Sequence, residues 1–135
     1  FNLNVYMHKK DEDLSKNLPH YCQIFGIKTL KSPNITNFID EENIIKIGNY
    51  AFTVIYTPGH TQGGISYKIE NNVFVGDTLF NNSIGRTDLP GGSLSTLLKS
   101  IKNKLFSLDD NIKVFCGHGP TTTIGYEKKN NIFLK

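Results

Sequence analysis

Two histidines and one aspartate in this sequence directly follow glycines: His60, Asp77 and His118. Each glycine comes at the end of an apolar stretch typical of a β-strand, with a Thr-Pro turn in between in the case of His60. Glycine permits a sharp turn at little steric cost, so the next residue projects from the rim of the sheet. Imidazole and carboxylate ligands together suit zinc or iron. The pattern predicts a metal site made by these three residues.

Each of these residues has a plainer interpretation when it is considered alone. A single histidine in a loop is more often an ordinary polar residue, and an aspartate after a glycine often only caps a turn. His8 and His20 have no flanking glycine, and we interpret them as ordinary polar residues. His60 and His118 differ because both occur in the same strand–glycine–histidine context. Taken together, the three candidate ligands favour the metal site.

Arg86 is the only arginine in a chain whose other basic residues are all lysine. A planar guanidinium donates two parallel hydrogen bonds to a carboxylate, which a lysine cannot do. Arg86 and Asp88 follow Asp77 in one loop, and we expect them to shape this loop near the site through an ion pair or hydrogen bonds. On spacing alone, an exposed turn is an equally good interpretation.

The composition excludes several classes of protein. The net charge of +3 comes from scattered lysines without a basic stripe, which argues against nucleic-acid binding. No apolar run approaches the roughly 20 residues that span a bilayer, and the first eight residues do not resemble a signal peptide. Two cysteines do not make a disulfide framework, so we expect free thiols in the cytoplasm or a reducing organelle, not secretion. For Cys116, core packing is favoured over metal ligation.

The elements that would position these residues can be predicted from apolar periodicity. We expect a strand at residues 3–8, a short helix at 9–16 with Asp11 as N-cap, and an irregular segment at 17–40. Two hairpins are expected, at 44–47 with 51–56 and at 65–69 with 73–75. A helix begins at Ser93 and places Leu94, Leu97, Leu98, Ile101 and Leu105 on one face. A strand at 112–116 and a helical turn at 124–130 complete one α/β domain over residues 1–135.

Four stretches of this sequence resemble the metallo-β-lactamase-fold hydrolases, and within them the small hydroxyacylglutathione hydrolase (glyoxalase II)-like proteins. They are TPGHTQGG at residues 57–64, GDTLF at 76–80, GRTDLPGG at 85–92 and GHGP at 117–120. The match runs in order over nearly the whole chain. It implies an αββα sandwich whose metal site lies at one rim between the sheets.

The resemblance also implies roles for the candidate ligands. His60 would complete one metal site and His118 the other, with Asp77 bridging two zinc ions. The family's His-x-His-x-Asp-His motif does not occur in these 135 residues. In the family this motif lies upstream of the strand that residues 3–8 resemble. We therefore expect a partial sandwich that lacks its first strands and is the C-terminal portion of a longer parent protein.

Activity is expected of the parent protein rather than of this chain. Metal-dependent hydrolysis needs cations that lower the pKa of bound water to near neutrality and polarise the scissile carbonyl. With the upstream ligands absent, we expect partial or no zinc in this chain and little hydrolysis of a small-molecule thioester substrate. A sheet without its first strands also exposes an edge and an apolar face, which favours self-association.

Two alternatives stay open. A persulfide dioxygenase with a single iron shares several of these stretches, and two histidines with one carboxylate suit iron and O₂. The Gly-Pro that follows His118 argues mildly against it. A degenerate, non-catalytic domain that acts through its surface is the second alternative.

Overall fold

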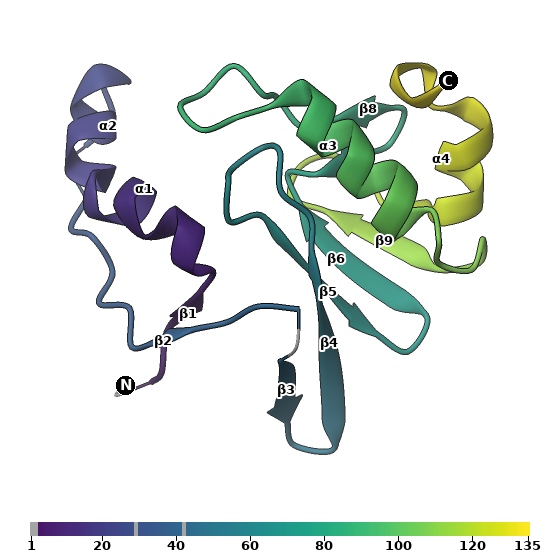
Figure 1. Cartoon of the computed structure of the whole chain (residues 1–135), viewed down its shortest axis with the longest axis horizontal. Helices are drawn as coiled ribbons and strands as arrows, with labels where there is room; N and C mark the ends of the chain where they lie inside the picture. The colour runs from purple at the N-terminus through teal and green to yellow at the C-terminus, as the bar shows by residue number, and fades with distance from the viewer. Residues whose placement is uncertain (1–2, 29, 42) are drawn as a thin grey trace. The chain divides into compact units, whose positions relative to one another are not determined.

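A computed structural model describes residues 3–28, 30–41 and 43–135, and the chain divides into two compact units, residues 1–39 and 40–135 (Figure 1). Each unit has its own secondary structure. The single domain expected over residues 1–135 stays a prediction. No helix in the described part of the chain is long and apolar enough to cross a membrane.

The first unit is built from short elements. Strand β1 (Tyr6–Met7) pairs in parallel with β2 (Asn37–Phe38). Between them lie the 3-10 turn η1 (Lys9–Asp11) and the helices α1 (Glu12–Lys16) and α2 (Leu18–Ile24). The helix expected at residues 9–16 is present as η1 followed by α1, and Asp11 stands at the N-cap position of α1 without a side-chain capping hydrogen bond. The strand expected at 3–8 is reduced to two residues.

Helix α2 contradicts the prediction of an irregular segment at residues 17–40. Prolines in this segment, such as Pro19, favour an interruption on sequence grounds, but Pro19 stands in the first turn of the helix. Its fixed φ suits a helix start, and its missing N–H would have no partner there in any case. A proline in a sequence can therefore mark the first turn of a helix as well as an interruption between elements.

The second unit contains a six-stranded sheet built from β3 (Ile44–Ile47), β4 (Tyr50–Tyr56), β5 (Ile65–Ile69), β6 (Asn72–Gly76), β9 (Lys113–Cys116) and β10 (Thr122–Thr123). The strand order is β10-β9-β6-β5-β4-β3. Neighbouring strands are antiparallel except β6 and β9, which are parallel. Both predicted hairpins are confirmed, one turning at Gly48-Asn49 and the other at Glu70-Asn71.

The parallel pair β6–β9 is joined by a crossover that contains a helix. Helix α3 (Leu94–Ser100) begins at Ser93, whose hydroxyl accepts a hydrogen bond from the backbone N–H of Thr96, and continues into the π-helical turn η2 (Ile101–Leu105). Leu97, Ile101 and Leu105 are fully buried, as the periodicity predicts, but Leu94 is half exposed. The apolar face thus starts one turn later than predicted.

One face of the sheet carries the core. Valines of β6 and β9 alternate inward and pack with α3, η2 and helix α4 (Ile124–Asn130), which is followed by the 3-10 turn η3 (Ile132–Leu134). On the opposite face the rings of Phe74 and Phe115 stack with centroids 4.9 Å apart. This second face has a hollow of about 370 Å³, lined by Ile45, Ile47, Phe52, Tyr67 and Phe74. The second unit therefore presents aromatic and aliphatic side chains away from its core.

Candidate metal centre

The loop that carries His60 is packed tightly against helix α3. Gly59 has a φ of 139°, and a Cβ at this position would lie 2.4 Å from the Cα of Leu97. The hydroxyl of Ser100 donates a 2.6 Å hydrogen bond to the carbonyl of Pro58. Glycine is thus required for both the backbone conformation and the close approach, and it fixes where His60 leaves the sheet.

Asp77 and His118 come to one rim of the sheet because β6 and β9 are parallel neighbours. The backbone N–H of Gly117 donates a 2.7 Å hydrogen bond to the carbonyl of Gly76, at the ends of these strands. A Cβ at Gly117 would lie 2.2 Å from Oδ1 of Asp77. The absence of a side chain at Gly117 therefore makes room for the Asp77 carboxylate beside His118.

The carboxylate of Asp77 lies between the two imidazoles. Its Oδ1 is 2.9 Å from Nδ1 of His118, and its Oδ2 is 3.7 Å from Nε2 of His60. The side chains of His60 and Asp77 are 23% and 29% exposed, whereas that of His118 is 79% exposed. The structure thus brings the three predicted residues together, with Asp77 in the middle and His118 open to solvent.

A backbone carbonyl fixes the orientation of the His60 ring. Nδ1 of His60 lies 2.8 Å from the carbonyl oxygen of Arg86. A carbonyl can only accept, so Nδ1 must carry the hydrogen, and in the neutral ring the lone pair is on Nε2, the atom nearest Asp77. Histidines that bind metals commonly make this kind of hydrogen bond with the nitrogen that does not face the ion. This carbonyl was not predicted, because backbone acceptors leave no signal in the sequence.

The spacing of His60 Nε2 and Asp77 Oδ2 is compatible with a shared ion. Two ligand atoms that bind one ion, each about 2.1 Å from it, lie roughly 3 to 4 Å apart. The 3.7 Å between these two atoms falls within this range, whereas the 2.9 Å contact between His118 and Asp77 is a hydrogen bond that the Nδ1–H of His118 donates to Oδ1. Within the described residues, no group of three or more His, Cys, Asp and Glu side chains is arranged so that it could hold a metal ion. The role of the three residues as ligands therefore stays a prediction.

Arg86 and Asp88 form an ion pair on the surface of the loop. Nε and Nη2 of Arg86 donate hydrogen bonds of 2.8 and 2.7 Å to the two oxygens of Asp88. The guanidinium hydrogen bonds lower the pKa of the Asp88 carboxyl to about 2, and the pKa of Arg86 is raised by the same pair. Both side chains are exposed. Arg86 thus reaches the candidate centre with its carbonyl group, not with its guanidinium.

Phe80 contacts the His118 ring, and Cys116 precedes His118 by two residues in the sequence. The ring of Phe80 meets the His118 ring edge to face, with centroids 6.2 Å apart. Cys116 packs against the core, its thiol 3.7 Å from the carbonyl of Pro120, and burial raises the pKa of the thiol. This agrees with the expected packing role of Cys116.

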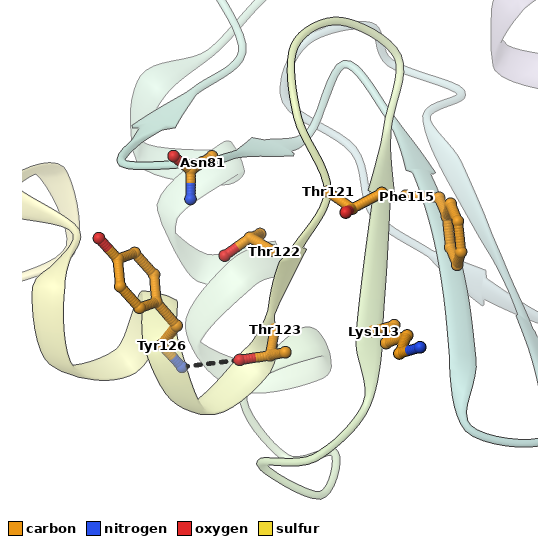
Figure 2. A pocket seen from close by; sticks show the side chains of 7 residues that line it. All are labelled: Asn81, Lys113, Phe115, Thr121, Thr122, Thr123 and Tyr126. Carbon is orange, nitrogen blue, oxygen red and sulfur yellow. Dashed lines mark hydrogen bonds between the residues drawn. The ribbon is translucent and has the colours of Figure 1, made fainter.

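A separate cleft of about 480 Å³ lies beside the edge strand β10. Figure 2 shows Asn81, Thr122 and Tyr126 on one side of β10 and Lys113 and Phe115 on β9. None of the candidate ligands lines this cleft.

A sequence model of the metallo-beta-lactamase superfamily matches residues 1–118. The hydroxyacylglutathione hydrolase GloC of Haemophilus influenzae is 42% identical over 135 residues, which cover 94% of this chain and 61% of the relative. The crystal structure of TTHA1623 in a di-iron-bound form has a TM-score of 0.89 and 34% identity, covering 99% of this chain and 66% of that one. That of ETHE1 from Myxococcus xanthus has a TM-score of 0.70 and 35% identity, covering 73% and 45%.

The chain spans less than two thirds of the length of each of these three proteins. The expected fold class, a mixed α/β metallo-β-lactamase fold, is confirmed by the structural matches. The sequence match and the shared fold lead to one conclusion: the chain belongs to the metallo-beta-lactamase superfamily.

Proposed function

We propose that His60, Asp77 and His118 belong to the metal centre of a hydrolase that acts on small-molecule thioesters of the hydroxyacylglutathione type. The observation that supports this most directly is the Asp77 carboxylate, which offers one oxygen to each imidazole. The 42% identity to a hydroxyacylglutathione hydrolase supports the substrate class. The reaction is assigned to the parent protein, not to this chain alone.

The three residues have distinct tasks in this proposal. His60 and His118 would each hold one zinc ion, and Asp77 would bridge the two ions. When bound, zinc lowers the pKa of a water molecule to near neutrality and polarises the scissile carbonyl. The chain itself supplies orientation: the Arg86 carbonyl keeps the lone pair of His60 on Nε2, and Gly117 leaves space for the carboxylate.

The chain alone is proposed to bind zinc weakly and to be nearly inactive. It contains no His-x-His-x-Asp-His motif, so any ion held by these three residues would keep many open positions. The test is hydrolysis of S-lactoylglutathione by the purified chain and by the parent protein, each with and without added zinc. Turnover by the chain alone in proportion to bound zinc would overturn its proposed inactivity. A zinc-loaded parent without thioesterase activity would overturn the substrate class.

A persulfide dioxygenase that uses one iron is the second candidate function. It is favoured by the ligand set, since two histidines and a carboxylate suit a single iron. A 34% identical protein whose crystal structure is a di-iron-bound form supports iron as the metal, but with two ions and not one. Metal analysis separates the candidates, since the hydrolase should contain two zinc ions per parent chain and the dioxygenase one iron. A degenerate domain without catalysis would bind neither metal stoichiometrically. In each case, the free thiols of Cys22 and Cys116 favour a reducing compartment.

A further inference from the structure

Glu127 of helix α4 is a fully buried carboxylate that takes no part in the proposed reaction. Its Oε1 accepts a 2.5 Å hydrogen bond from the hydroxyl of Thr122 and lies 3.5 Å from Nδ2 of Asn81. Its Oε2 accepts from the backbone N–H of Asn82 at 3.1 Å and from Nδ2 of Asn131 at 2.8 Å. One carboxylate thus joins strand β10, the end of α4 and the Asn81-Asn82 turn.

Burying a carboxylate is costly unless donors surround it, and a carboxylate can only accept. Glu127 meets this condition with donors from three separate segments of the chain. Removal of such a group leaves its donors without their partner, a larger penalty than the net contribution of an ordinary hydrogen bond. The position of the Asn81-Asn82 turn is therefore tied to Glu127.

The turn at Asn81-Asn82 is the tip of a hairpin that the sequence analysis did not predict. Its strands are β7 (Leu79–Phe80) and β8 (Ser83–Ile84), and Asn82 has a φ of 56°. A second hydrogen bond from the C-terminal end of α4 holds the same hairpin: Nδ2 of Asn131 also donates to the carbonyl of Ser83 at 3.0 Å. Figure 2 shows Asn81 on this hairpin facing the same space as Thr122 and Tyr126.

Both ends of the hairpin contact His60. Asp77 precedes it and offers Oδ2 to His60, and Arg86 follows it and offers its carbonyl. The two chain segments lie close together at the open end of the hairpin. The N–H of Gly85 donates to the carbonyl of Thr78, and a Cβ at Gly85 would lie 1.8 Å from the carbonyl oxygen of Asp77. A shift of the hairpin would therefore move both partners of His60.

The same hairpin also contacts the second histidine. Phe80 of β7 meets the His118 ring edge to face. Phe80 lies on this short hairpin, and Asp77 and the Arg86 carbonyl flank its two ends, while the tip of the hairpin is held by Glu127.

We propose that Glu127 is a positioning residue for the candidate metal centre: by clamping the β7–β8 hairpin it sets the orientation of His60 and His118. Its importance for catalysis rests on the proposed function, but the positioning itself does not. The proposal can therefore be tested on the metal-free 135-residue chain.

The test compares Glu127→Gln with Thr123→Ala by long-range ¹H–¹⁵N NMR of the histidine rings, under conditions where each variant is folded by circular dichroism. Thr123 caps α4 by accepting from the N–H of Tyr126, so its loss weakens the same helix and leaves the Glu127 hydrogen bonds in place. Glu127→Gln keeps the shape but turns one acceptor into a donor that faces other donors. We expect it to abolish the single Nδ1–H tautomer of His60 and to shift the His118 signals, whereas Thr123→Ala leaves both unchanged.

A second variant covers the case in which Glu127→Gln does not fold. Asn81→Ala, at the hairpin tip, removes one donor to Glu127 and should shift the same ring signals in the same direction, by less. Unchanged ring signals in a folded Glu127→Gln variant would overturn the proposal. Equal changes in Thr123→Ala would also overturn it, because they would show only general destabilisation of α4. If the parent protein proves not to be a hydrolase, none of these outcomes is affected.

Discussion

Nδ1 of His118 lies 2.9 Å from Oδ1 of Asp77, although 41 residues separate them in the sequence. The parallel pairing of β6 with β9 produces this closeness, since Gly76 and Cys116 are partners in the register and the next residues turn over the same rim. His60 reaches the other oxygen of the carboxylate from a loop that is held against α3. Asp77 is therefore the residue on which the whole arrangement depends.

Asp77→Asn should reduce zinc affinity more than any other isosteric change in the chain. The amide keeps the shape of Asp77 but has only one acceptor oxygen and no charge, so it cannot serve both imidazoles. We expect a loss of at least about tenfold, the lower end of what even outer-shell changes cost at metal sites. Isothermal titration with zinc, on the parent protein and on the chain, measures it.

Asp88→Asn is the matched control for this experiment, because it removes an exposed carboxylate eleven residues further along and leaves Asp77 intact. Zinc affinity should stay within about twofold of the wild type, as befits an exposed ion pair. Equal losses in the two variants would show that Asp77 acts only through net charge.

Gly117→Ala should displace the Asp77 carboxylate. The new Cβ would lie 2.2 Å from Oδ1 of Asp77 and 3.1 Å from the carbonyl carbon of Gly76, so one of them has to move. We expect a loss of zinc affinity together with a destabilisation of about 1 to 3 kcal/mol, typical of overpacking. Urea unfolding of the metal-free chain and zinc titration measure the two effects.

Gly119→Ala separates steric clash from backbone strain. Gly119 has a φ of 81°, but nothing lies within 4 Å of a Cβ built there. This variant should cost about 1 kcal/mol of strain and leave zinc affinity nearly unchanged. A similar loss of affinity in both variants would mean that glycine is needed for the loop conformation and not for the space beside Asp77.

Periodicity and glycine placement predicted the elements that carry the site. The hairpins through β3–β4 and β5–β6 and the buried stripe Leu97, Ile101 and Leu105 follow from local patterns of period 2 and 3.6. The strand–glycine–ligand pattern also placed three candidate ligands that the structure brings together. Such features are readable because each is specified within a few consecutive residues.

What could not be predicted depends on contacts between distant segments. The β7–β8 hairpin has only two residues in each strand, and its tip is held by Glu127, more than forty residues away. The Arg86 carbonyl that orients His60 is a backbone group and would be present with any side chain. The sequence indicates a role for the Arg86 guanidinium because Arg86 is the only arginine, whereas a backbone carbonyl leaves no signal in the sequence.

The Arg86–Asp88 pair predicts a small dependence of loop stability on pH. Hydrogen bonds from Arg86 lower the pKa of Asp88 from its ordinary value of 3.8 to about 2 in the folded chain. The folded state therefore gains stability from ionised Asp88 above pH 4, and this gain is lost as the pH falls through 4 towards 2. Because both side chains are exposed, the effect is screened by salt and is small.

Chemical unfolding of wild type and Asp88→Asn across this pH range provides the measurement. The two proteins should differ slightly in stability at pH 5 and should converge as the pH approaches 2. A difference that grows on acidification would have the wrong sign for a carboxyl with a lowered pKa.

The edge strand β3 predicts self-association of the purified chain. Ile44 and Ile47 on this strand are 63% and 62% exposed, and Ile47 borders the apolar hollow on the open face of the sheet. An exposed, apolar edge strand readily pairs with a second copy, and a lysine placed on it opposes such pairing. Sedimentation velocity should show concentration-dependent oligomers for the wild type and mostly monomer for Ile47→Lys.

The control is Ile132→Lys, which adds the same charge at a residue that is 70% exposed on η3 and not on the sheet. This variant should leave association unchanged. If both lysine substitutions reduce the oligomer fraction equally, association depends on net charge or on another surface, and the β3 edge is not its site.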